Sequence, residues 1–502
     1  MANHFADIVV IGSGFGGSVA ANRLALAGRQ VLVLERGPWR DTLPVRSMGI
    51  SDRSPLPLGW QAVTHAVRSV HRGRFGLTLN RRGFFDVVFT PGLQILCPSS
   101  VGGGSIAWGG MVDRPLDPGY WDGRHPGLVP EMVEKYYPKI FSDLGAHQLR
   151  RDSYQPQSLW DHLPDSDGLD CRAMQEQAHT AYLVPDSSSG RAQVCSLPGG
   201  VQRKFSNFDG DGFLGSPGGT KASVDFIYLA PVMKRGVTVR SLCEVSRLQR
   251  QPQAEGGGYI VTFTDHASGA QERVAARQVV LAAGTMNTLD LLFRSQEGRD
   301  GLATMPALGR NFGANCDLLG LWHRSGCGKS SLIGMPCLGT FTVAGHDNAI
   351  FGVGTMAGYD QLPMPAAFRR RLADYYVLFS MGPDSGSASV SFRHGKLVVH
   401  YDPDREPLYD EIRSGYRILA AESGDKTLIQ RTPLTANQWG GASLGATAEL
   451  GVVDHLGEVY GNPGLFITDA SALPAAVGRP PSATVAAWAH HVADTLGAGP
   501  PA

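Results

Sequence analysis

The fold is decided by residues 6–17, ADIVVIGSGFGG, where a short apolar run rich in β-branched residues leads directly into a Gly-x-Gly-x-x-Gly turn. Residues 18–27 after the turn are small and compatible with a helix, and a second apolar run, residues 30–34, ends in Glu35. Strand, glycine turn, helix, strand and acid follow one another with the spacing of a dinucleotide-binding βαβ unit. The sequence therefore predicts a dinucleotide site at the start of the chain.

Each glycine of the turn has a mechanical reason. Gly12 allows the tight turn, Gly14 lets the backbone approach a pyrophosphate, and Gly17 lets the helix lie close to the sheet. The helix N-terminus offers free N–H groups to the phosphates, and Glu35 is placed to accept hydrogen bonds from a ribose. An acid at this position favours FAD or NAD over NADP. Three neighbours are expected to complete the site: Phe15, Gly16 and Arg36.

The composition excludes several classes of protein. Lys plus Arg and Asp plus Glu number 45 each, so nothing indicates binding to nucleic acid or to an anionic membrane. The apolar runs are too short for a membrane span, and the first strand begins by about Phe5, which leaves no room for a signal peptide. The seven cysteines are scattered without a CxxC pair, which indicates free thiols and no metal site. We therefore expect a cytoplasmic protein, and the frequent Ala, Arg and Gly indicate a bacterial source.

A second glycine-rich segment, residues 101–111 (VGGGSIAWGGM), follows a proline-containing region in which the helix–strand rhythm is lost. Five of the nine residues from Gly102 to Gly110 are glycine, yet Ile106 and Trp108 stand between them. A flexible linker rarely carries such side chains. Backbone packed flush against a flat ligand is the better explanation.

Hydrophobic periodicity predicts the remaining elements. Strands of the α/β unit are expected at residues 237–240, 243–245, 278–284 and 464–469, with an inserted hairpin at 259–264 and 273–276. Helices are expected at residues 128–144 (with a kink at Pro138), 223–234, 285–294 and 482–496. Alternating runs within residues 315–430, such as 387–392 and 396–400, predict an antiparallel sheet in a second domain.

Together these segments resemble the glucose-methanol-choline (GMC) family of FAD enzymes, and within it the bacterial cholesterol oxidases. The resemblance rests on residues 12–17 with Glu35, the glycine segment 101–111, the end of the 278–284 run, and residues 462–469 followed by Val477-Gly478. It covers nearly the whole chain. It implies an α/β fold, in which a doubly wound, Rossmann-like FAD-binding domain carries a β-rich substrate domain of antiparallel sheet plus helices.

The resemblance also implies how the chain is divided and where FAD, bound non-covalently, makes contact. The FAD-binding domain would comprise residues 1–41, 219–314 and 450–502, and the substrate domain residues 42–218 and 315–449, whose segment 97–115 contacts FAD. Val245 would meet the adenine through its backbone, Asp469 the ribityl or pyrophosphate region, and the helix N-terminus near Ser482 the pyrimidine edge of the flavin. The other expected contacts are Gly102, Gly103, Gly104, Ser105, Gly109, Gly110, Met111, Ala283, Gly284, Ala470, Pro480 and Pro481.

This sequence differs from the cholesterol oxidases that it resembles at the positions of the residues that take part in alcohol oxidation. Those enzymes use a histidine in a His-Pro-Leu-Gly-Gly motif, a late asparagine in an Asn-Pro pair, and a glutamate. Asn437 stands at the histidine position, Pro480 at the asparagine, Val353 or a neighbour at the glutamate, and Trp108 where asparagine is usual. An amide cannot accept a proton near neutral pH, and proline has no donor. Because general base catalysis contributes about a hundred- to ten-thousand-fold, ordinary alcohol oxidation should be crippled.

Two functions remain open for a bulky, largely apolar substrate of sterol-like or polyketide-like kind. In the first, the protein is a flavin-dependent alcohol oxidase or dehydrogenase that uses another base, such as His323, His346 or Asp360. In the second, it is a redox-neutral cyclase, isomerase or lyase of specialised metabolism in which FAD is a scaffold. The resembling family includes a lyase and a fatty-acid photodecarboxylase. A binding protein without activity is a third alternative.

For the second function, four side chains are expected to touch the substrate: Asn437, Gln438, Trp439 and Trp108. Arg479 would bind a substrate carboxylate or oxyanion, and a salt bridge at the domain seam is the alternative. His490 and His491 lie more than two turns into the last helix, where packing or surface positions are expected.

Overall fold

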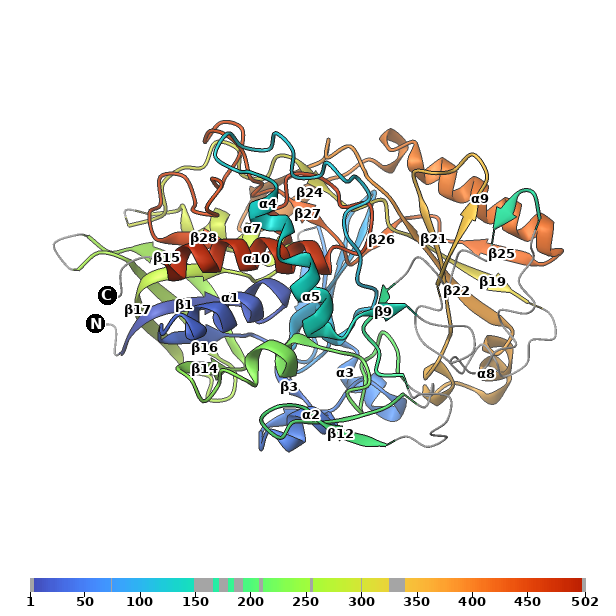
Figure 1. The fold of residues 1–502 in the computed structure, drawn as a ribbon, viewed down its shortest axis with the longest axis horizontal. Coiled ribbons are helices and arrows are strands. Elements are labelled where there is room, and N and C mark those ends of the chain that lie inside the picture. Colours follow the sequence, from blue (N-terminus) through green and yellow to red (C-terminus); the bar gives the residue numbers. More distant parts are fainter. Residues whose placement is uncertain are drawn as a thin grey trace.

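The computed structural model describes residues 4–73, 75–148, 166–170, 179–184, 193–206, 211–252, 256–298, 300–324 and 339–498. Two large sheets lie at opposite ends of the molecule, and a third sheet lies between them (Figure 1). The first and last elements of the described chain, residues 4–11 and 482–497, both belong to the end that carries the predicted dinucleotide unit (Figure 1).

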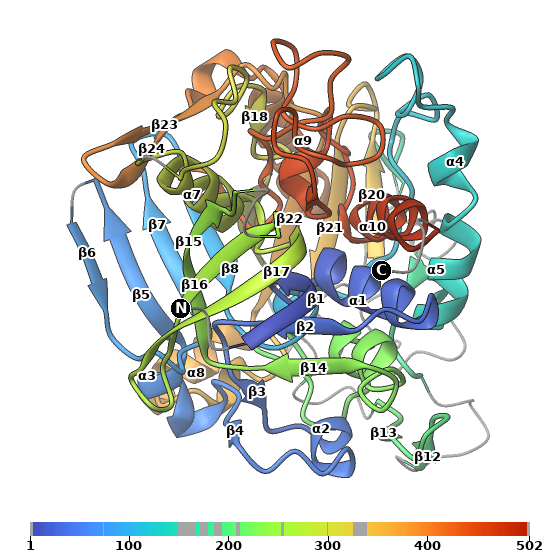
Figure 2. The same cartoon turned by 90° about the vertical axis from the view of Figure 1, so that its left-hand side faces the viewer.

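The sheet at this end has seven strands. Their order is β14 (Val237–Arg240), β2 (Val31–Leu34), β1 (His4–Ile11), β17 (Gln271–Leu281), β16 (Tyr259–Asp265) and β15 (Cys243–Arg250), and β28 (Leu465–Ile467) also pairs with β17. β14, β2, β1, β17 and β28 run parallel to one another, whereas β16 is antiparallel to β17 and forms an antiparallel hairpin with β15 (Figure 2). Ile8, Val9 and Val10 are fully buried, as expected for a central strand covered on both faces.

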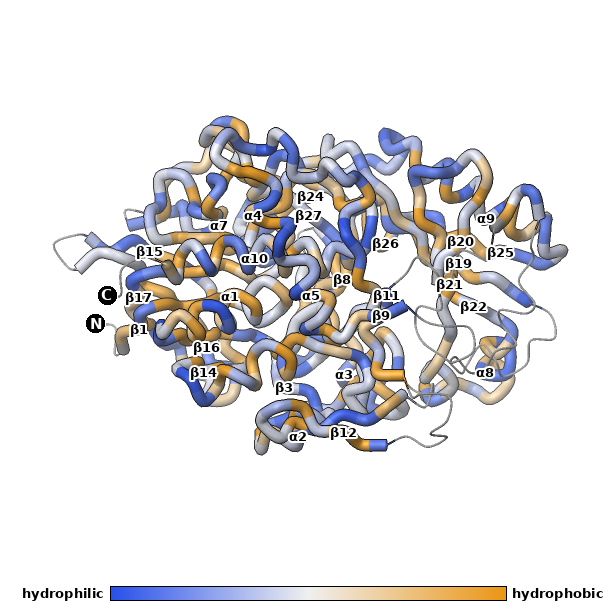
Figure 3. Tube along the Cα trace, in the orientation of Figure 1, coloured by the Kyte–Doolittle hydropathy of each residue, from blue (hydrophilic) through white to orange (hydrophobic). Residues whose placement is uncertain are grey.

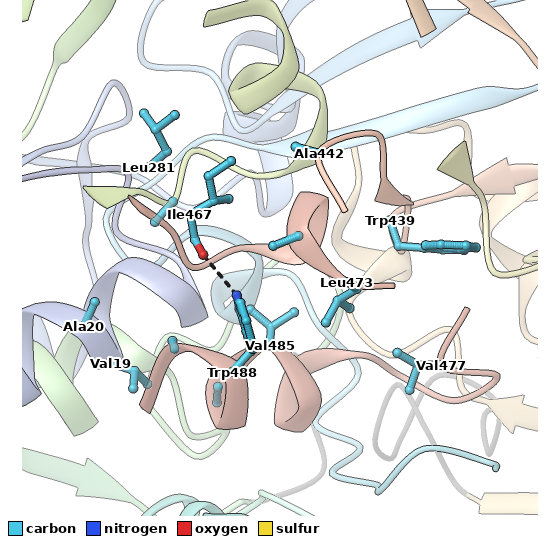
Figure 4. Packing of buried hydrophobic residues seen from close by; sticks show 14 of the residues in the cluster. Val19, Ala20, Leu281, Trp439, Ala442, Ile467, Leu473, Val477, Val485 and Trp488 are labelled. Carbon is cyan, nitrogen blue, oxygen red and sulfur yellow. Dashed lines mark hydrogen bonds between the residues drawn. The ribbon is translucent and has the colours of Figure 1, made fainter. Parts of the chain in front are cut away.

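Helix α1 (Phe15–Leu26) begins directly after the glycine turn, and α10 (Ser482–Gly497) packs beside it. A Cβ on Gly17 would lie 2.0 Å from the carbonyl oxygen of Gly12, so glycine is required for α1 to pack this close. Trp488 of α10 is 1 % exposed and donates its indole N–H to Ile467 O over 3.0 Å (Figure 4). Apolar residues are concentrated along β1, β16 and α1 (Figure 3).

The sheet at the opposite end has six antiparallel strands in the order β10 (Leu169–Asp170), β20 (Gly339–Val343), β21 (Ile350–Gly354), β22 (Tyr375–Met381), β19 (Leu318–His323) and β25 (Lys426–Ile429). Helix α9 (Leu408–Ser423) covers this sheet (Figure 1). The third sheet has the order β26 (Leu434–Thr435), β8 (Gln94–Pro98), β7 (Phe85–Phe89), β5 (Val67–Arg72) and β6 (Phe75–Thr78) (Figure 2).

Short elements complete the described part of the chain. The two-stranded pairs are β3 (Trp39–Arg40) with β4 (Arg53–Ser54), β9 (His147–Gln148) with β11 (His179–Thr180), β12 (Val194–Ser196) with β13 (Gln202–Lys204), β18 (Phe312–Gly313) with β27 (Trp439–Gly440), and β23 (Ser389–Arg393) with β24 (Lys396–His400). The other helices are α2 (Leu43–Ser47), α3 (Ala62–His65), α4 (Glu131–Glu134), α5 (Tyr137–Leu144), α7 (Thr285–Ser295) and α8 (Ala366–Leu372). Within the described residues, no helix is both long enough and apolar enough to cross a bilayer.

Four expectations about elements need correction. The helix predicted at 128–144 is two helices, α4 and α5, and Pro138 lies in the first turn of α5, where its missing N–H costs nothing. The helix predicted at 223–234 has helical geometry only over Asp225–Leu229, shortly before Pro231. The strands predicted at 273–276 and 278–284 are one strand, β17, because β1 pairs along its length. The runs at 387–392 and 396–400 form a separate ribbon outside the six-stranded sheet.

Candidate active site

The glycine turn after β1 meets the second glycine segment. A Cβ on Gly103 would lie 2.6 Å from Gly14 Cα, so the two backbones touch, and Gly102 N–H donates to Ser13 Oγ over 3.1 Å. A Cβ on Gly104 or on Gly284 would meet no protein atom within 4 Å, so open space adjoins both. No side chain caps the N-terminus of α1, and its first turn carries no acid. Free N–H groups beside open space fit the diphosphate of FAD.

Glu35 follows β2 and is joined to the turn by hydrogen bonds. Its Oε2 accepts from Ser13 N at 3.0 Å and from Ser13 Oγ at 2.7 Å, and its Oε1 accepts from Gly37 N at 2.7 Å. Burial raises the pKa of this carboxyl, and the bonds from Gly37 and Ser13 oppose the rise. Because Ser13 Oγ also accepts from Gly102 N, three segments expected to hold FAD are linked through one hydroxyl.

Asp469 lies just after β28 and accepts four hydrogen bonds. They come from Gly284 N at 2.9 Å, Thr288 Oγ1 at 2.5 Å, Ser471 N at 2.9 Å and Ser471 Oγ at 2.6 Å. Burial raises the pKa of the Asp469 carboxyl against these bonds. The carboxyl thus fixes the start of α7 against the end of β28, and its contact with FAD stays a prediction.

Trp108 is fixed in place by the segment around residue 221. Its indole N–H donates to Ala222 O over 3.0 Å, and its ring meets Phe15 edge-on with 5.0 Å between the ring centroids. Lys221 Nζ donates to Trp108 O and to Gly212 O, each at 2.8 Å, and burial lowers the pKa of this amine to about 7. The Trp108 ring therefore lies directly beside the glycine turn.

The other predicted cofactor residues are distributed as follows. Arg36 pairs with Asp86 and donates to Asn287 Oδ1 at 2.9 Å. Gly110 lies against the ring of Tyr182, and Val245 adjoins a β-bulge of β15. Pro480 and Pro481 lead into α10, whose first turn, beginning at Ser482, has no side-chain cap and no acid. Gly16 lies in the first turn of α1, and the remaining members lie in the segments already described: Ser105, Gly109, Met111, Ala283 and Ala470.

Asn437, at the histidine position, is held by a buried acid. Its Nδ2 donates to Asp317 Oδ2 over 2.9 Å, and Thr435 Oγ1 donates to the same oxygen over 2.7 Å. Asp317 is 5 % exposed, and burial raises the pKa of its carboxyl to about 7. The amide is therefore oriented with its N–H toward the protein.

The two residues after Asn437 have buried side chains. Trp439 is 2 % exposed, and its indole N–H donates to Asp384 Oδ1 over 2.8 Å. Burial raises the pKa of Asp384 to about 6. Gln438 is 8 % exposed and donates to Cys97 Sγ over 3.6 Å. Asn437, which is half-buried, is thus the more accessible of the three.

A strained segment joins the Asn437 loop to the Arg479 loop. Asn315 Nδ2 donates to Arg479 O over 3.1 Å, and Asn315 Oδ1 accepts from Gly478 N over 2.8 Å. Two residues farther on, Asp317 holds Asn437. Asn315 and Cys316 have φ values of 56° and 44°, a conformation that L-residues rarely adopt. Sequence reasoning missed this segment, because nothing in its composition marks it.

A cavity of about 200 Å³ lies where the glycine segment, the six-stranded sheet and the loop before α10 meet. Residues 113–116, Thr340, Ile350 and Arg479 line it. Burial raises the pKa of the Asp113 carboxyl to about 6, and the positive charge of Arg479 partly opposes the rise. Asp113 was also missed, although an acid two residues after the glycine segment was a signal in the sequence.

The alternative bases lie elsewhere or outside the described residues. His323 is half-buried on β19 against Tyr375, and His346 is half-buried in the loop between β20 and β21. The side chain of Asp360 lies outside the described residues. His490 and His491 are buried in α10, as packing residues. His490 stacks on Tyr136, and burial lowers its pKa to about 4.

Comparison with known proteins agrees with this geometry. Models of GMC oxidoreductases match residues 193–316 and 401–489, and a model of NAD(P)-binding Rossmann-like domains matches residues 10–39. A long-chain-alcohol oxidase of Arabidopsis thaliana is 23% identical over 98% of this chain and 67% of its own length. Cholesterol oxidases of Acinetobacter baumannii and Mycobacterium tuberculosis are 22% and 23% identical over 97% of this chain and 93% and 90% of their own lengths. With the glycine turns, the linked Glu35 and the uncapped helix N-termini, these matches show that the chain belongs to the GMC family of FAD-dependent oxidoreductases, as a relative of alcohol and cholesterol oxidases.

Proposed function

We propose that this enzyme acts on a bulky, largely apolar small molecule of specialised metabolism by redox-neutral chemistry: cyclisation, isomerisation or lyase chemistry. The proposal keeps the division into an FAD-binding domain (residues 1–41, 219–314 and 450–502) and a substrate domain (residues 42–218 and 315–449). FAD, when bound, supplies a flat polar ring, which in the family's oxidases accepts a hydride. Here the ring would shape the pocket.

The observation that carries the proposal is the orientation of Asn437. One of its two side-chain N–H groups donates to Asp317, and its oxygen accepts hydrogen bonds but cannot take up a proton near neutral pH. Pro480 offers no donor in place of the family's asparagine. The two positions that handle the alcohol proton in the oxidases therefore lack the chemistry for that task.

The same residues suit a binding role. Asn437 Oδ1 would accept a hydrogen bond from the substrate, while Trp108 would offer an apolar face beside Phe15. Gln438 and Trp439, whose side chains are buried, would contribute through their backbone and by holding Asn437. Arg479 would meet a negatively charged or polarised oxygen of the substrate.

Alcohol oxidation with a different base is the second candidate, because Asp113 favours it. This carboxyl lines the cavity, and burial raises its pKa to about 6. A base with that pKa would work near neutral pH.

The test is the visible absorption of the FAD-loaded protein in the dark without oxygen, during incubation first with sterols and then with metabolites of the source organism. Each mixture is assayed for product. Product that forms while the flavin stays oxidised supports redox-neutral chemistry. Bleaching of the oxidised flavin would refute it and favour Asp113 as the base. The variant Asp117→Asn, which changes an exposed acid on the same segment as Asp113, serves as a control.

A further inference from the structure

The cavity beside Arg479 is lined by both polar and apolar side chains. Asp113, Thr340 and Arg479 contribute polar groups, whereas Leu116 and Ile350 contribute apolar ones. Ile350 also belongs to a separate apolar cluster with three other side chains: Met111, Phe379 and Met381. The cavity therefore suits a molecule that carries both a polar group and apolar carbon atoms.

Asp113 and Arg479 face this space without pairing. The charge of Arg479 influences the Asp113 carboxyl, yet among the described residues no ion pair within 4.0 Å and no hydrogen bond joins the two side chains. Opposite charges that line one cavity and stay apart leave room for an atom of a ligand between them. An oxygen placed there could accept from Arg479 and, when the Asp113 carboxyl group is protonated, from Asp113 as well.

The charge balance of the cavity favours an anion. Two arginines, Arg114 and Arg479, line the cavity together with a single acid, Asp113. Arg114 is exposed and lies 5.1 Å from the centre of the Tyr137 ring, so its charge is partly engaged there. Arg479 has no such ring partner among the described residues. Burial raises the pKa of Asp113 to about 6, so near that pH the carboxyl group is partly neutral and can donate a hydrogen bond.

We propose that this cavity binds the acidic end of the substrate, a carboxylate or an ionised enol, with Arg479 neutralising the charge and the Asp113 carboxyl group donating a second hydrogen bond. The inference rests on the proposed function, because it names the substrate class of the same site. A neutral alcohol would leave the Arg479 charge without a partner. The acidic end thus distinguishes this substrate from an alcohol or a sterol.

The size of the cavity limits what it holds. Its volume of about 200 Å³ is below the roughly 300–1,000 Å³ of pockets that enclose whole ligands. It has room for an acid group and a few carbon atoms. The bulk of the substrate lies outside it, so the site fixes the orientation of an amphipathic molecule.

The test is calorimetric titration of the FAD-loaded protein, in the dark and without oxygen, with decanoate and with 1-decanol as a neutral probe of the same length. At pH 6 we expect decanoate to bind at least about tenfold more tightly than 1-decanol, because charged hydrogen bonds are strong. Arg479→Gln should abolish this preference and leave 1-decanol binding unchanged. Arg479→Lys, which keeps the charge and loses the planar fork, should retain part of it.

The pH dependence of decanoate binding tests the role of the Asp113 carboxyl group separately from that of Arg479. The other charged residues that line the cavity are Arg479 and Arg114, and their guanidinium groups stay charged over the tested range. As the pH rises from 6 to 8, Asp113 ionises and repels the probe, so decanoate binding should weaken by about tenfold or more. Asp113→Asn should remove this dependence, whereas Asp117→Asn, a change of an exposed acid on the same segment, should keep it.

Equal affinities for the two probes, an Arg479→Gln protein that still prefers decanoate, or a pH dependence that persists in Asp113→Asn would each overturn the inference. These binding constants are measured without turnover. Flavin bleaching by a substrate would refute the redox-neutral function and leave them unchanged, so the two failures are distinguishable. FAD content and circular dichroism establish that each variant is folded.

Discussion

Replacement of Asp317 by asparagine should change how the stability of the protein depends on pH. Burial raises the pKa of this carboxyl to about 7 in the folded protein, whereas an aspartate in an unfolded chain has a pKa of about 3.9. Because the pKa of Asp317 is higher in the folded protein than in the unfolded chain, the folded state loses stability at pH values where the unfolded carboxyl ionises. The cost is absent below about pH 4, grows up to about pH 7 and is then constant. Three pKa units correspond to about 4 kcal/mol.

Asp317→Asn removes the ionisation and keeps an oxygen that can accept from Thr435 and Asn437. At pH 4.5 the variant should be less stable than the parent by about 1–3 kcal/mol, because its NH2 group must be buried. About 1 kcal/mol of the cost is already present at pH 4.5, so between pH 4.5 and pH 8 the difference should shift in favour of the variant by about 3 kcal/mol. Urea unfolding followed by tryptophan fluorescence at pH 4.5, 6 and 8 measures it. The control is Asp410→Asn, on the exposed side of α9. A difference that is the same at all three pH values would refute the reasoning.

Three further substitutions test the fold and the site. Gly17→Val should prevent FAD binding and folding, because its Cβ would lie 2.0 Å from Gly12 O; a soluble, FAD-loaded variant would contradict this packing. Trp488→Ala should lower the free energy of unfolding by about 3–5 kcal/mol, measured in urea, and a loss below about 1 kcal/mol would mean that α10 is not anchored there. Asn437→His should not restore flavin bleaching by alcohols, because Pro480 still lacks a donor; anaerobic spectra with 1-decanol check this, and rapid bleaching would show that the histidine alone suffices.

The dinucleotide unit could be predicted from the sequence because its determinants are local. The strand, the glycine turn and the helix follow one another within residues 4–26, and the glycine spacing reports directly on the distance between α1 and Gly12. Helix α10 was predicted for a similar reason, since Pro481 and Ser482 mark its start. Such signals depend only on residues that are close in the sequence, so they can be recognised before the fold is known.

The polar surroundings of the site could not be predicted, because they join residues far apart in the chain. Asp317 holds Asn437, and Asn315 holds Arg479, through contacts that only the folded chain brings together. The continuity of β17 was missed for the same reason. Pairing with β1 carries the strand through Arg277, where the apolar run is interrupted. Long-range pairing thus overrode the local pattern.

Strand β28 and helix α10 are synthesised after all the other strands of the seven-stranded sheet. Both lie inside that sheet region, where β28 pairs with β17 and α10 packs on α1. The apolar surface of the early βαβ unit that α10 covers therefore stays exposed to solvent while the rest of the chain is synthesised. Folding that depends on such long-range contacts is slow, and it leaves aggregation-prone apolar surface exposed in the meantime. We expect nascent chains of this protein to need chaperone protection until α10 emerges, and FAD to be acquired only after that point.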